Sequence, residues 1–372
     1  MGLPLGGRRA VAAALATAAI AFLLGACGGH PKRSASSTAT SASTISSTST
    51  TRPAKAHKKK HHHPSTVKLV PTCPLTGTVP RDGKVPRRPA LAVKVENLPQ
   101  ARPQWGLDMA DIVFEEPVEG GITRFIAVYQ CHESARIEPV RSGRLVDAQI
   151  LQPLGQILFA YSGAIQPVIN EVDSPGSLLD DVGADKAGGA YSRDPTRYAP
   201  HNLMTSTAAL YSAAATFGYH PGPPSPIFTY GRMVEGGTPA AVVNLDFPLD
   251  VTTWAWHPKT GLYYRSYSDT GRAMQGDNVQ ITASNVVVMV VHEYPTQYVE
   301  DPTGAHENEL VLTGSGPAWV FRDGVQFYGK WERPKLSEPA YFVETNGNKV
   351  TLTAGNTWVE YVPQGEKVGV LP

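Results

Sequence analysis

The sequence predicts an α+β protein: a layered α/β N-terminal domain with a mixed sheet, followed by a smaller, mostly β C-terminal domain. Short β-branched or aromatic runs recur from residue 90 onwards, helical patterns occur only before residue 220, and four prolines within residues 220–226 separate the two halves. The 372 residues exceed one ordinary core and suit about two folded units of roughly 100–200 residues each.

The first 27 residues predict a lipoprotein signal peptide. Arg8 and Arg9 precede an apolar run at residues 10–24, whose length of about 22 Å is less than the roughly 30 Å of a bilayer core. The ending Leu24-Gly25-Ala26-Cys27 resembles a bacterial lipobox. Cys27 is therefore the predicted lipidation site, and its acyl chains, such as palmitate, would anchor the protein to the extracytoplasmic face of the cell membrane. The alternative is an ordinary secretory signal with a chance cysteine.

Residues 28–66 predict a disordered tether, because Ser, Thr and Ala dominate and almost nothing can be buried. This segment contains the run Lys58-Lys59-Lys60-His61-His62-His63. We interpret the run as a solvated spacer. Contact with anionic headgroups or wall polymers, and metal binding by the histidines, are the alternatives.

The charges are unevenly distributed. Up to Arg81 the chain has eleven Lys and Arg and no acid, which leaves 22 basic and 32 acidic residues after it and a net charge of about −10 there. A nucleic-acid-binding domain is therefore disfavoured, since it needs a dense positive face.

Three cysteines occur in the chain. With Cys27 lipidated, Cys73 and Cys131 remain as an even pair in an oxidising compartment, which favours a disulfide between them. Two free thiols are the alternative.

The first folded segment, residues 67–220, mixes strand and helix signals. Strands are predicted at residues 90–96, 112–116, 122–130 and 157–161. Ser174-Pro175 predicts the start of a helix, and a second helix is predicted at residues 206–217. A linker at residues 221–239 follows.

The second segment, residues 240–372, is predicted to be mostly β. Strand-like runs alternate with turns, and Asp323-Gly324 predicts a type I′ hairpin, because both residues tolerate positive φ. Five tryptophans could form a sugar-stacking platform, but packing within the sheets is the favoured interpretation. They are Trp254, Trp256, Trp319, Trp331 and Trp358.

The sequence lacks the usual phosphate-loop, nucleophile-elbow, zinc-protease and dinucleotide motifs. The candidate binding or catalytic sites are therefore the stretches where charged residues are dense. Residues 101–124 and 138–144 alternate acids and arginines. The guanidinium groups of Arg124, Arg141 and Arg144 match phosphate or carboxylate oxygens. The full set of predicted ligand-binding residues is Arg124, Arg141, Arg144, His201, Asn202, Glu96, Asn97 and Glu119.

A divalent cation such as Mg²⁺ is a further expectation. Asp108, Asp111, Glu115 and Glu119 supply oxygen ligands, and Asp111 and Glu115 are the predicted pair. The alternative is that all these charges pair among themselves at the ends of the sheet.

Ten stretches of the sequence form a recognisable set of short motifs. They are Ala92-Val-Lys-Val-Glu-Asn97, Ala101-Arg-Pro-Gln104, Ala110-Asp-Ile-Val-Phe-Glu115, Val118-Glu-Gly-Gly-Ile-Thr-Arg-Phe125, Pro139-Val-Arg-Ser-Gly-Arg144, His201-Asn-Leu203, Pro258-Lys-Thr-Gly-Leu-Tyr263, Gly314-Ser-Gly316, Asp323-Gly324 and Gly355-Asn-Thr-Trp358. This set resembles the DUF3048 family of YerB-like bacterial lipoproteins. The resemblance covers nearly everything after residue 88 and implies a layered α/β first domain with a smaller C-terminal companion, but no established reaction. The family's Asp-Asn after the first strand is Glu96-Asn97 here, which keeps the carboxylate.

Together these features favour a membrane-anchored extracytoplasmic lipoprotein that binds an anionic cell-envelope component, or organises a wall-synthesis protein, through an Arg-rich cleft. The alternative is a metal-assisted phosphotransferase or hydrolase acting on a phosphate-linked envelope polymer, loosely analogous to LytR-CpsA-Psr transferases. A third possibility is a structural spacer that presents only a surface for partner proteins.

Overall fold

The computed structural model describes residues 70–232, 236–300 and 303–372. The predicted signal peptide and tether lie outside these ranges, and so does Cys27. Residues from Thr66 to Pro372 form one compact unit. Among the helices in the described ranges, none has the length and apolar character needed to cross a bilayer.

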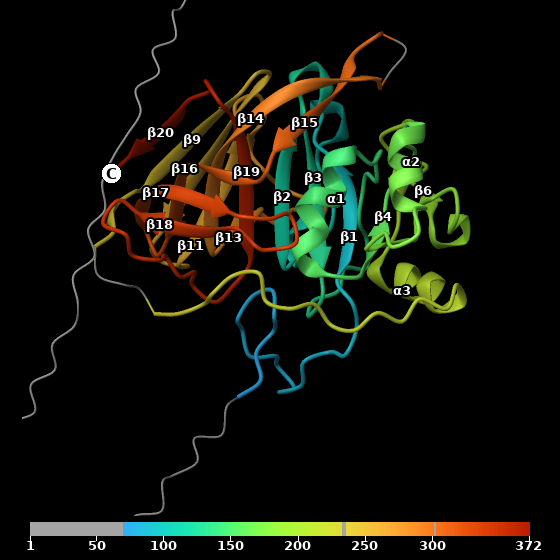
Figure 1. The fold of residues 1–372 in the computed structure, drawn as a ribbon, viewed down its shortest axis with the longest axis horizontal. Helices are drawn as coiled ribbons and strands as arrows, with labels where there is room; N and C mark the ends of the chain where they lie inside the picture. Colours follow the sequence, from blue (N-terminus) through green and yellow to red (C-terminus); the bar gives the residue numbers. More distant parts are fainter. Residues whose placement is uncertain (1–69, 233–235, 301–302) are drawn as a thin grey trace, which may run out of the picture. The chain divides into compact units, whose positions relative to one another are not determined.

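A twelve-stranded mixed sheet forms the centre of the fold (Figure 1). Neighbours pair parallel within β14-β19-β2 and within β1-β4-β5, and antiparallel elsewhere along the sheet. β15 (His306–Val311) pairs with β14, and β8 (Thr238–Pro239) pairs with β17. The order of the ten other strands is β18 (Tyr341–Glu344), β17 (Val325–Arg333), β16 (Gly314–Arg322), β14 (Asn285–Val299), β19 (Thr357–Pro363), β2 (Ile112–Pro117), β3 (Thr123–Tyr129), β1 (Leu91–Glu96), β4 (Ile157–Ala160) and β5 (Leu179–Asp181).

Strands from both halves of the sequence share this sheet. β19 pairs with β2 in parallel, with Thr357 opposite Ile112 and Glu360 opposite Glu115. The expected mixed sheet is therefore present. The predicted linker at residues 221–239 lies between the two halves of the sequence. The sheet is nevertheless continuous across the halves, because β19 of the second half pairs with β2 of the first.

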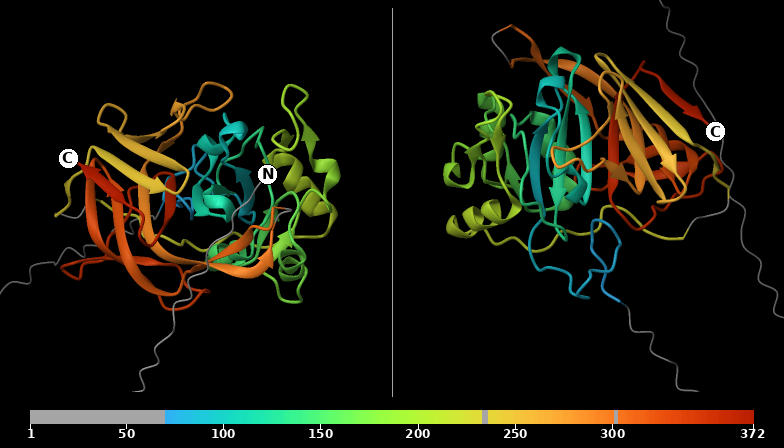
Figure 2. Two further views of the ribbon diagram at one scale, coloured as in Figure 1. Left: turned by 90° about the horizontal axis from the view of Figure 1, so that it is seen from above. Right: turned by 180° about the vertical axis from the view of Figure 1, so that it is seen from behind.

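A six-stranded sheet packs on one face of the central sheet (Figure 2). Trp254 from the smaller sheet meets Trp358 from β19 edge to face, with ring centroids 5.1 Å apart, and both rings are buried. The predicted role of the tryptophans in packing is confirmed for these two and for Trp331. The strands are β12 (Gly271–Arg272), β11 (Leu262–Tyr267), β10 (Asp250–His257), β9 (Val242–Phe247) and β20 (Val368–Leu371), with β13 (Thr282–Ala283) paired to β11; a separate pair is β6 (Ser192–Arg193) with β7 (Leu203–Met204).

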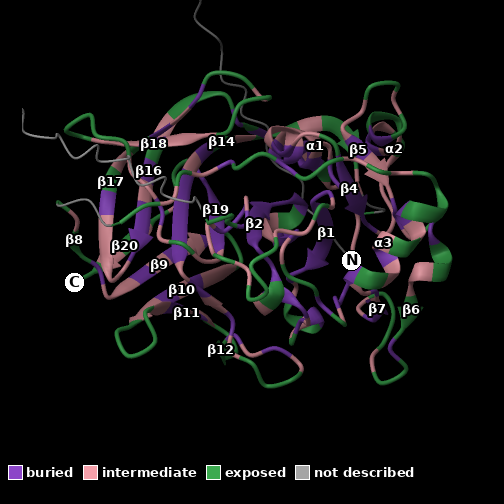
Figure 3. Ribbon diagram, turned by 90° about the horizontal axis from the view of Figure 1, so that it is seen from below, coloured by how far each residue is buried: buried purple, intermediate pink, exposed green. Residues whose placement is uncertain are grey.

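Helices cover both faces of the first-half strands. α1 (Leu145–Leu151) and α2 (Gln166–Val172) bury Ile150 and Val172 on one face, whereas α3 (Thr207–Thr216) buries Leu210 in the core on the other. The strands between them are buried over most of their length (Figure 3). Five short 3₁₀ turns complete the part of the fold that the structure describes: η1 (Pro99–Ala101), η2 (Leu107–Met109), η3 (Glu119–Gly121), η4 (Gln152–Leu154) and η5 (Gly188–Ala190).

Local sequence signals predicted several of these elements. The four first-half strands are confirmed as β1 to β4. Ser206 caps α3 by accepting a hydrogen bond from the Ala209 amide at 3.2 Å. Asp323 and Gly324 both have positive φ in the turn between β16 and β17. The Cys73–Cys131 disulfide is also confirmed.

The helix predicted to start at Ser174-Pro175 is wrong. Ser174 follows α2, and its hydroxyl donates to the carbonyl of Glu171, so it closes a helix instead of opening one. Leu179 lies in β5 and pairs with Ile157. Long-range pairing with β4 therefore decided the conformation of this segment.

Candidate functional site

A polar cluster forms where the first-half strands end beneath α1. Arg124 on β3 lies opposite Glu96 on β1 and opposite Glu116 on β2. Residues directly opposite in paired strands project to the same side of a sheet, so these three side chains share the face that α1 covers. All three are buried.

The segment leading into α1 contributes two more arginines. Arg144 is the N-cap residue of α1 and is locked in place: its Nε donates to Glu119 Oε2 at 2.9 Å, its Nη2 contacts Glu119 Oε1, and its Nη1 lies 2.8 Å from Glu300 Oε1. Although burial opposes the charged form, hydrogen bonding and charge from Glu119 raise the pKa of Arg144 above its ordinary value. Arg144 is thus permanently cationic.

Arg124 is buried but incompletely paired. Its residue is 4 % exposed, and its nearest carboxylate oxygen, Glu119 Oε1, lies 3.6 Å from Nη2. Nε and Nη1 have no hydrogen-bond partner among the described residues. Burial, reinforced by the charge of Arg144, lowers the pKa of Arg124 to about 10. Buried donors without acceptors are costly, so this guanidinium is suited to an incoming anion.

Arg141 and His201 lie on the more open side of the cluster, and both contact Glu96. Arg141 Nε lies 3.2 Å from Glu96 Oε1, and His201 Nδ1 lies 2.9 Å from Oε2. The Arg141 and His201 side chains are 24 % and 23 % exposed, whereas the Glu96 side chain is 1 % exposed. Arg141 and His201 are therefore more accessible than Arg124.

We define the arginine cluster as the six predicted residues that the structure brings together. Three arginines, two buried carboxylates and one histidine converge there, although they come from four separate stretches of sequence, with Arg141 and Arg144 in one of them. The expectation that the charges merely pair among themselves holds for Arg144 but not for Arg124, which keeps two spare donors. The members are Arg124, Arg141, Arg144, Glu96, Glu119 and His201.

Two of the predicted ligand-binding residues do not join the cluster. Asn97 faces the opposite side of the sheet, where its Nδ2 donates to Glu115 Oε1 at 3.1 Å and to Thr123 Oγ1 at 2.8 Å. Asn202 is structural, because its Nδ2 donates to the carbonyls of Asp194 and Arg197 in the turn before His201. Asn202 therefore supports the loop that carries His201.

The structure does not bring the predicted metal pair together. Asp111, just before β2, accepts hydrogen bonds from backbone amides including Cys131 and contacts His132 Nδ1, while Glu115 pairs with Arg265 at 2.6 Å. The two acids are four positions apart along extended chain, which separates their Cα atoms by roughly 13 Å. Within the described ranges, no group of three or more His, Cys, Asp or Glu side chains is arranged to hold a metal ion.

Sequence reasoning missed a buried triad beside the cluster. Lys94 Nζ lies 2.8 Å from Asp147 Oδ1 and also contacts Glu116, and all three side chains are buried. Burial, followed by the charge of Asp147, raises the pKa of Glu116 to about 8. A lysine inside the apolar run of β1 was the available signal, since buried lysines are rarely unpaired.

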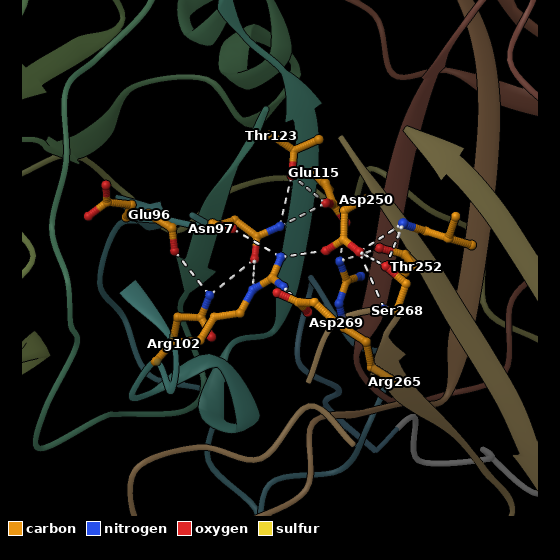
Figure 4. A network of polar contacts seen from close by, with 12 residues as sticks. Glu96, Asn97, Arg102, Glu115, Thr123, Asp250, Thr252, Arg265, Ser268 and Asp269 are labelled. Atoms are coloured by element: carbon orange, nitrogen blue, oxygen red, sulfur yellow. Dashed lines mark hydrogen bonds and ion pairs between the residues drawn. The ribbon is translucent and has the colours of Figure 1, made fainter. Parts of the chain in front are cut away.

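A second missed network lies on the opposite face of the sheet (Figure 4). Arg265 of β11 reaches Glu115 of β2 and Glu360 of β19, and Arg102 reaches Asp250 and Asp269. These partners are 95 to 167 residues apart. Such separations leave no local pattern from which to predict the pairs.

Comparison with known proteins identifies the family. A family described as "Protein of unknown function (DUF3048) N-terminal domain" matches residues 75–220, and its C-terminal counterpart matches residues 243–359. The chain belongs to the DUF3048 family. The two matched segments correspond to the two halves of the sequence, and the expected family resemblance is thereby confirmed.

A relative and a solved structure agree with this assignment. The Bacillus subtilis (strain 168) protein named "Putative lipoprotein YerB" is 26% identical over 314 residues, which cover 83% of this chain and 88% of the relative. The crystal structure of YerB from Bacillus subtilis superposes with a TM-score of 0.69 at 24% identity, covering 80% of this chain and 99% of that one. The solved structure supports the fold.

Proposed function

We propose that this protein is a lipoprotein, anchored at the extracytoplasmic face of the membrane through Cys27, whose arginine cluster binds an anionic group of a cell-envelope component. The spare donors of Arg124 are the observation that carries this proposal. The lipobox-like ending at Cys27 and the name of the YerB relative support the anchor.

The anion-binding role rests on the incomplete pairing of Arg124. Glu119 is shared by Arg124 and Arg144, although Arg144 also pairs with Glu300, and Glu96 is shared by Arg141 and His201. A phosphate or carboxylate oxygen reaching Arg124 Nε and Nη1 would accept charge-assisted hydrogen bonds and would offset the repulsion between Arg124 and Arg144. The metal-assisted transferase is less well supported, because Asp111 and Glu115 lie apart and already have partners.

The ligand in this proposal is a wall polymer bearing phosphate or carboxylate groups, and a wall-synthesis protein is the alternative partner. Either would be met outside the membrane by a folded part that the residues before Thr66 connect to the lipid anchor. Nucleic acid is not a proposed ligand, because the folded part carries excess acid.

Arg124→Gln should weaken anion binding by about 10- to 100-fold, the range expected when hydrogen bonds from a charged donor are lost. The fragment from Thr66 to Pro372 suits the test, since it forms one compact unit. Titration calorimetry with pyrophosphate measures the affinity, and thermal unfolding confirms that the variant is folded.

Arg232→Gln is the matched control, because Arg232 is exposed and undergoes the same change of charge. It should leave pyrophosphate affinity unchanged. Equal affinities for the two variants, or an unmodified fragment that binds no pyrophosphate, would refute the proposal. Repeating the comparison with isolated wall polymer then tests whether the envelope supplies the anion.

A further inference from the structure

A cavity of about 340 Å³ lies on the face of the sheet opposite the arginine cluster. Its volume falls within the roughly 300–1,000 Å³ of small-molecule sites. The first half of the sequence contributes Leu98 and Ile122 to its wall, and the second half contributes Phe247 and Leu249. Because both family segments build it, this cavity is a feature of the assembled fold.

The strongest donors on the cavity wall are already used. Arg102 donates to Asp269 at 2.8 Å, to Asp250 at 2.7 Å and to the backbone and side chain of Asn97, and its guanidinium stacks 3.5 Å from the ring centroid of Tyr267. The Asn97 amide group donates inward to Glu115 and Thr123. Asn97 has no free donor and Arg102 already uses four of its five N–H groups on two carboxylates and Asn97, so an anion would be poorly bound here.

The wall instead carries an excess of carboxylates. Asp250 and Asp269 share the single guanidinium of Arg102, and the charge of Glu115 is balanced by its ion pair with Arg265. This leaves about one negative charge beside the apolar residues. Asp269 lies on the open side, with its side chain 38 % exposed, and Figure 4 shows it together with Asp250 around Arg102.

We propose that this cavity binds an organic cation, with an ammonium group at Asp269 and Asp250 and an apolar group packed against Ile122, Phe247 and Leu249. The apolar wall supplies burial, and the uncompensated carboxylate selects the charge of the ligand. This site goes beyond the proposed anion-binding function, uses none of its residues and takes a ligand of opposite charge.

Three probes that share a phenyl group test the charge preference: 2-phenylethylammonium, 2-phenylethanol and 3-phenylpropionate. Amide chemical shifts of the fragment from Thr66 to Pro372 measure their affinities and locate their binding. The ammonium compound should bind most tightly and shift residues around Leu249 and Asp269. A carboxylate or alcohol that binds as tightly as the ammonium, or the absence of any shift there, would overturn the proposal.

Variants at exposed wall positions separate binding from folding. Asp269→Asn should weaken the ammonium compound about fivefold, as expected for a partly exposed ion pair, and Leu249→Ser should weaken all probes that bind. Asp185→Asn, an exposed acid elsewhere, should change nothing. Equal effects of the two Asp→Asn variants would contradict the assignment. Arg124→Gln should leave binding of the ammonium compound intact, so failure of one proposal is distinguishable from failure of the other.

Discussion

Replacing Arg265 with methionine should destabilise the folded protein by about 3–5 kcal/mol, the cost of leaving a buried charge without its partner. Arg265 is completely buried and donates to Glu115 Oε2 at 2.6 Å, to Glu360 Oε1 at 3.1 Å and to Thr252. Its guanidinium also lies 4.8–5.3 Å from the ring centroids of Phe125, Trp254, Tyr267 and Trp358. The substitution therefore removes the cation that joins the two sheets.

Urea unfolding of the fragment from Thr66 to Pro372 measures this loss. Lys335→Met is the control, since Lys335 is 73 % exposed and its pair with Glu338 spans 3.6 Å, so its loss should cost less than about 1 kcal/mol. Arg265→Lys should recover part of the stability by restoring charge without the planar fork. If Arg265→Met and Lys335→Met unfold at the same urea concentration, Arg265 does not stabilise the junction between the sheets.

Removing the disulfide should cost about 4 kcal/mol. Cys73 and Cys131 are 58 residues apart, and the chain-entropy account assigns roughly that stabilisation to closing a loop of this length. The bond fixes the segment before β1 to the end of β3, where Asp111 also accepts the amide hydrogen of Cys131.

Cys131→Ser and chemical reduction should lower the unfolding midpoint by the same amount. Reductant should have no further effect on Cys131→Ser, which controls for other actions of the reagent. If reductant leaves the midpoint of the unmodified fragment unchanged while thiol titration shows that the bond is open, the disulfide contributes no stability.

Local signals predicted the strands of the first half because β-branched runs between turns determine strand formation without long-range information. The same reasoning placed a helix after Ser174, where pairing of Leu179 with Ile157 prevailed. It also gave no prediction that the two halves share a sheet, because nothing near Ile112 or Thr357 in the sequence indicates that these residues pair.

The arginine cluster was largely predictable, because its members lie in short motifs where charge is unusually dense. The separation of Asp111 and Glu115 was not predictable. The prediction of a metal pair required two free carboxylates, whereas backbone amides near Cys131 bind Asp111 and Arg265 binds Glu115. Carboxylates in a sequence carry no indication of the donors that long-range folding brings to them. Arg265 and Lys94 were missed for the same reason.

The most direct measurement of the central claim is the NMR signal of the arginine Nε–H groups during titration with pyrophosphate. Arg124 Nε–H should shift most and saturate with the calorimetric affinity, and Arg141 should shift alongside it, whereas exposed Arg232 should move little. A signal from Arg124 that stays in place at saturating pyrophosphate would contradict anion binding by the arginine cluster.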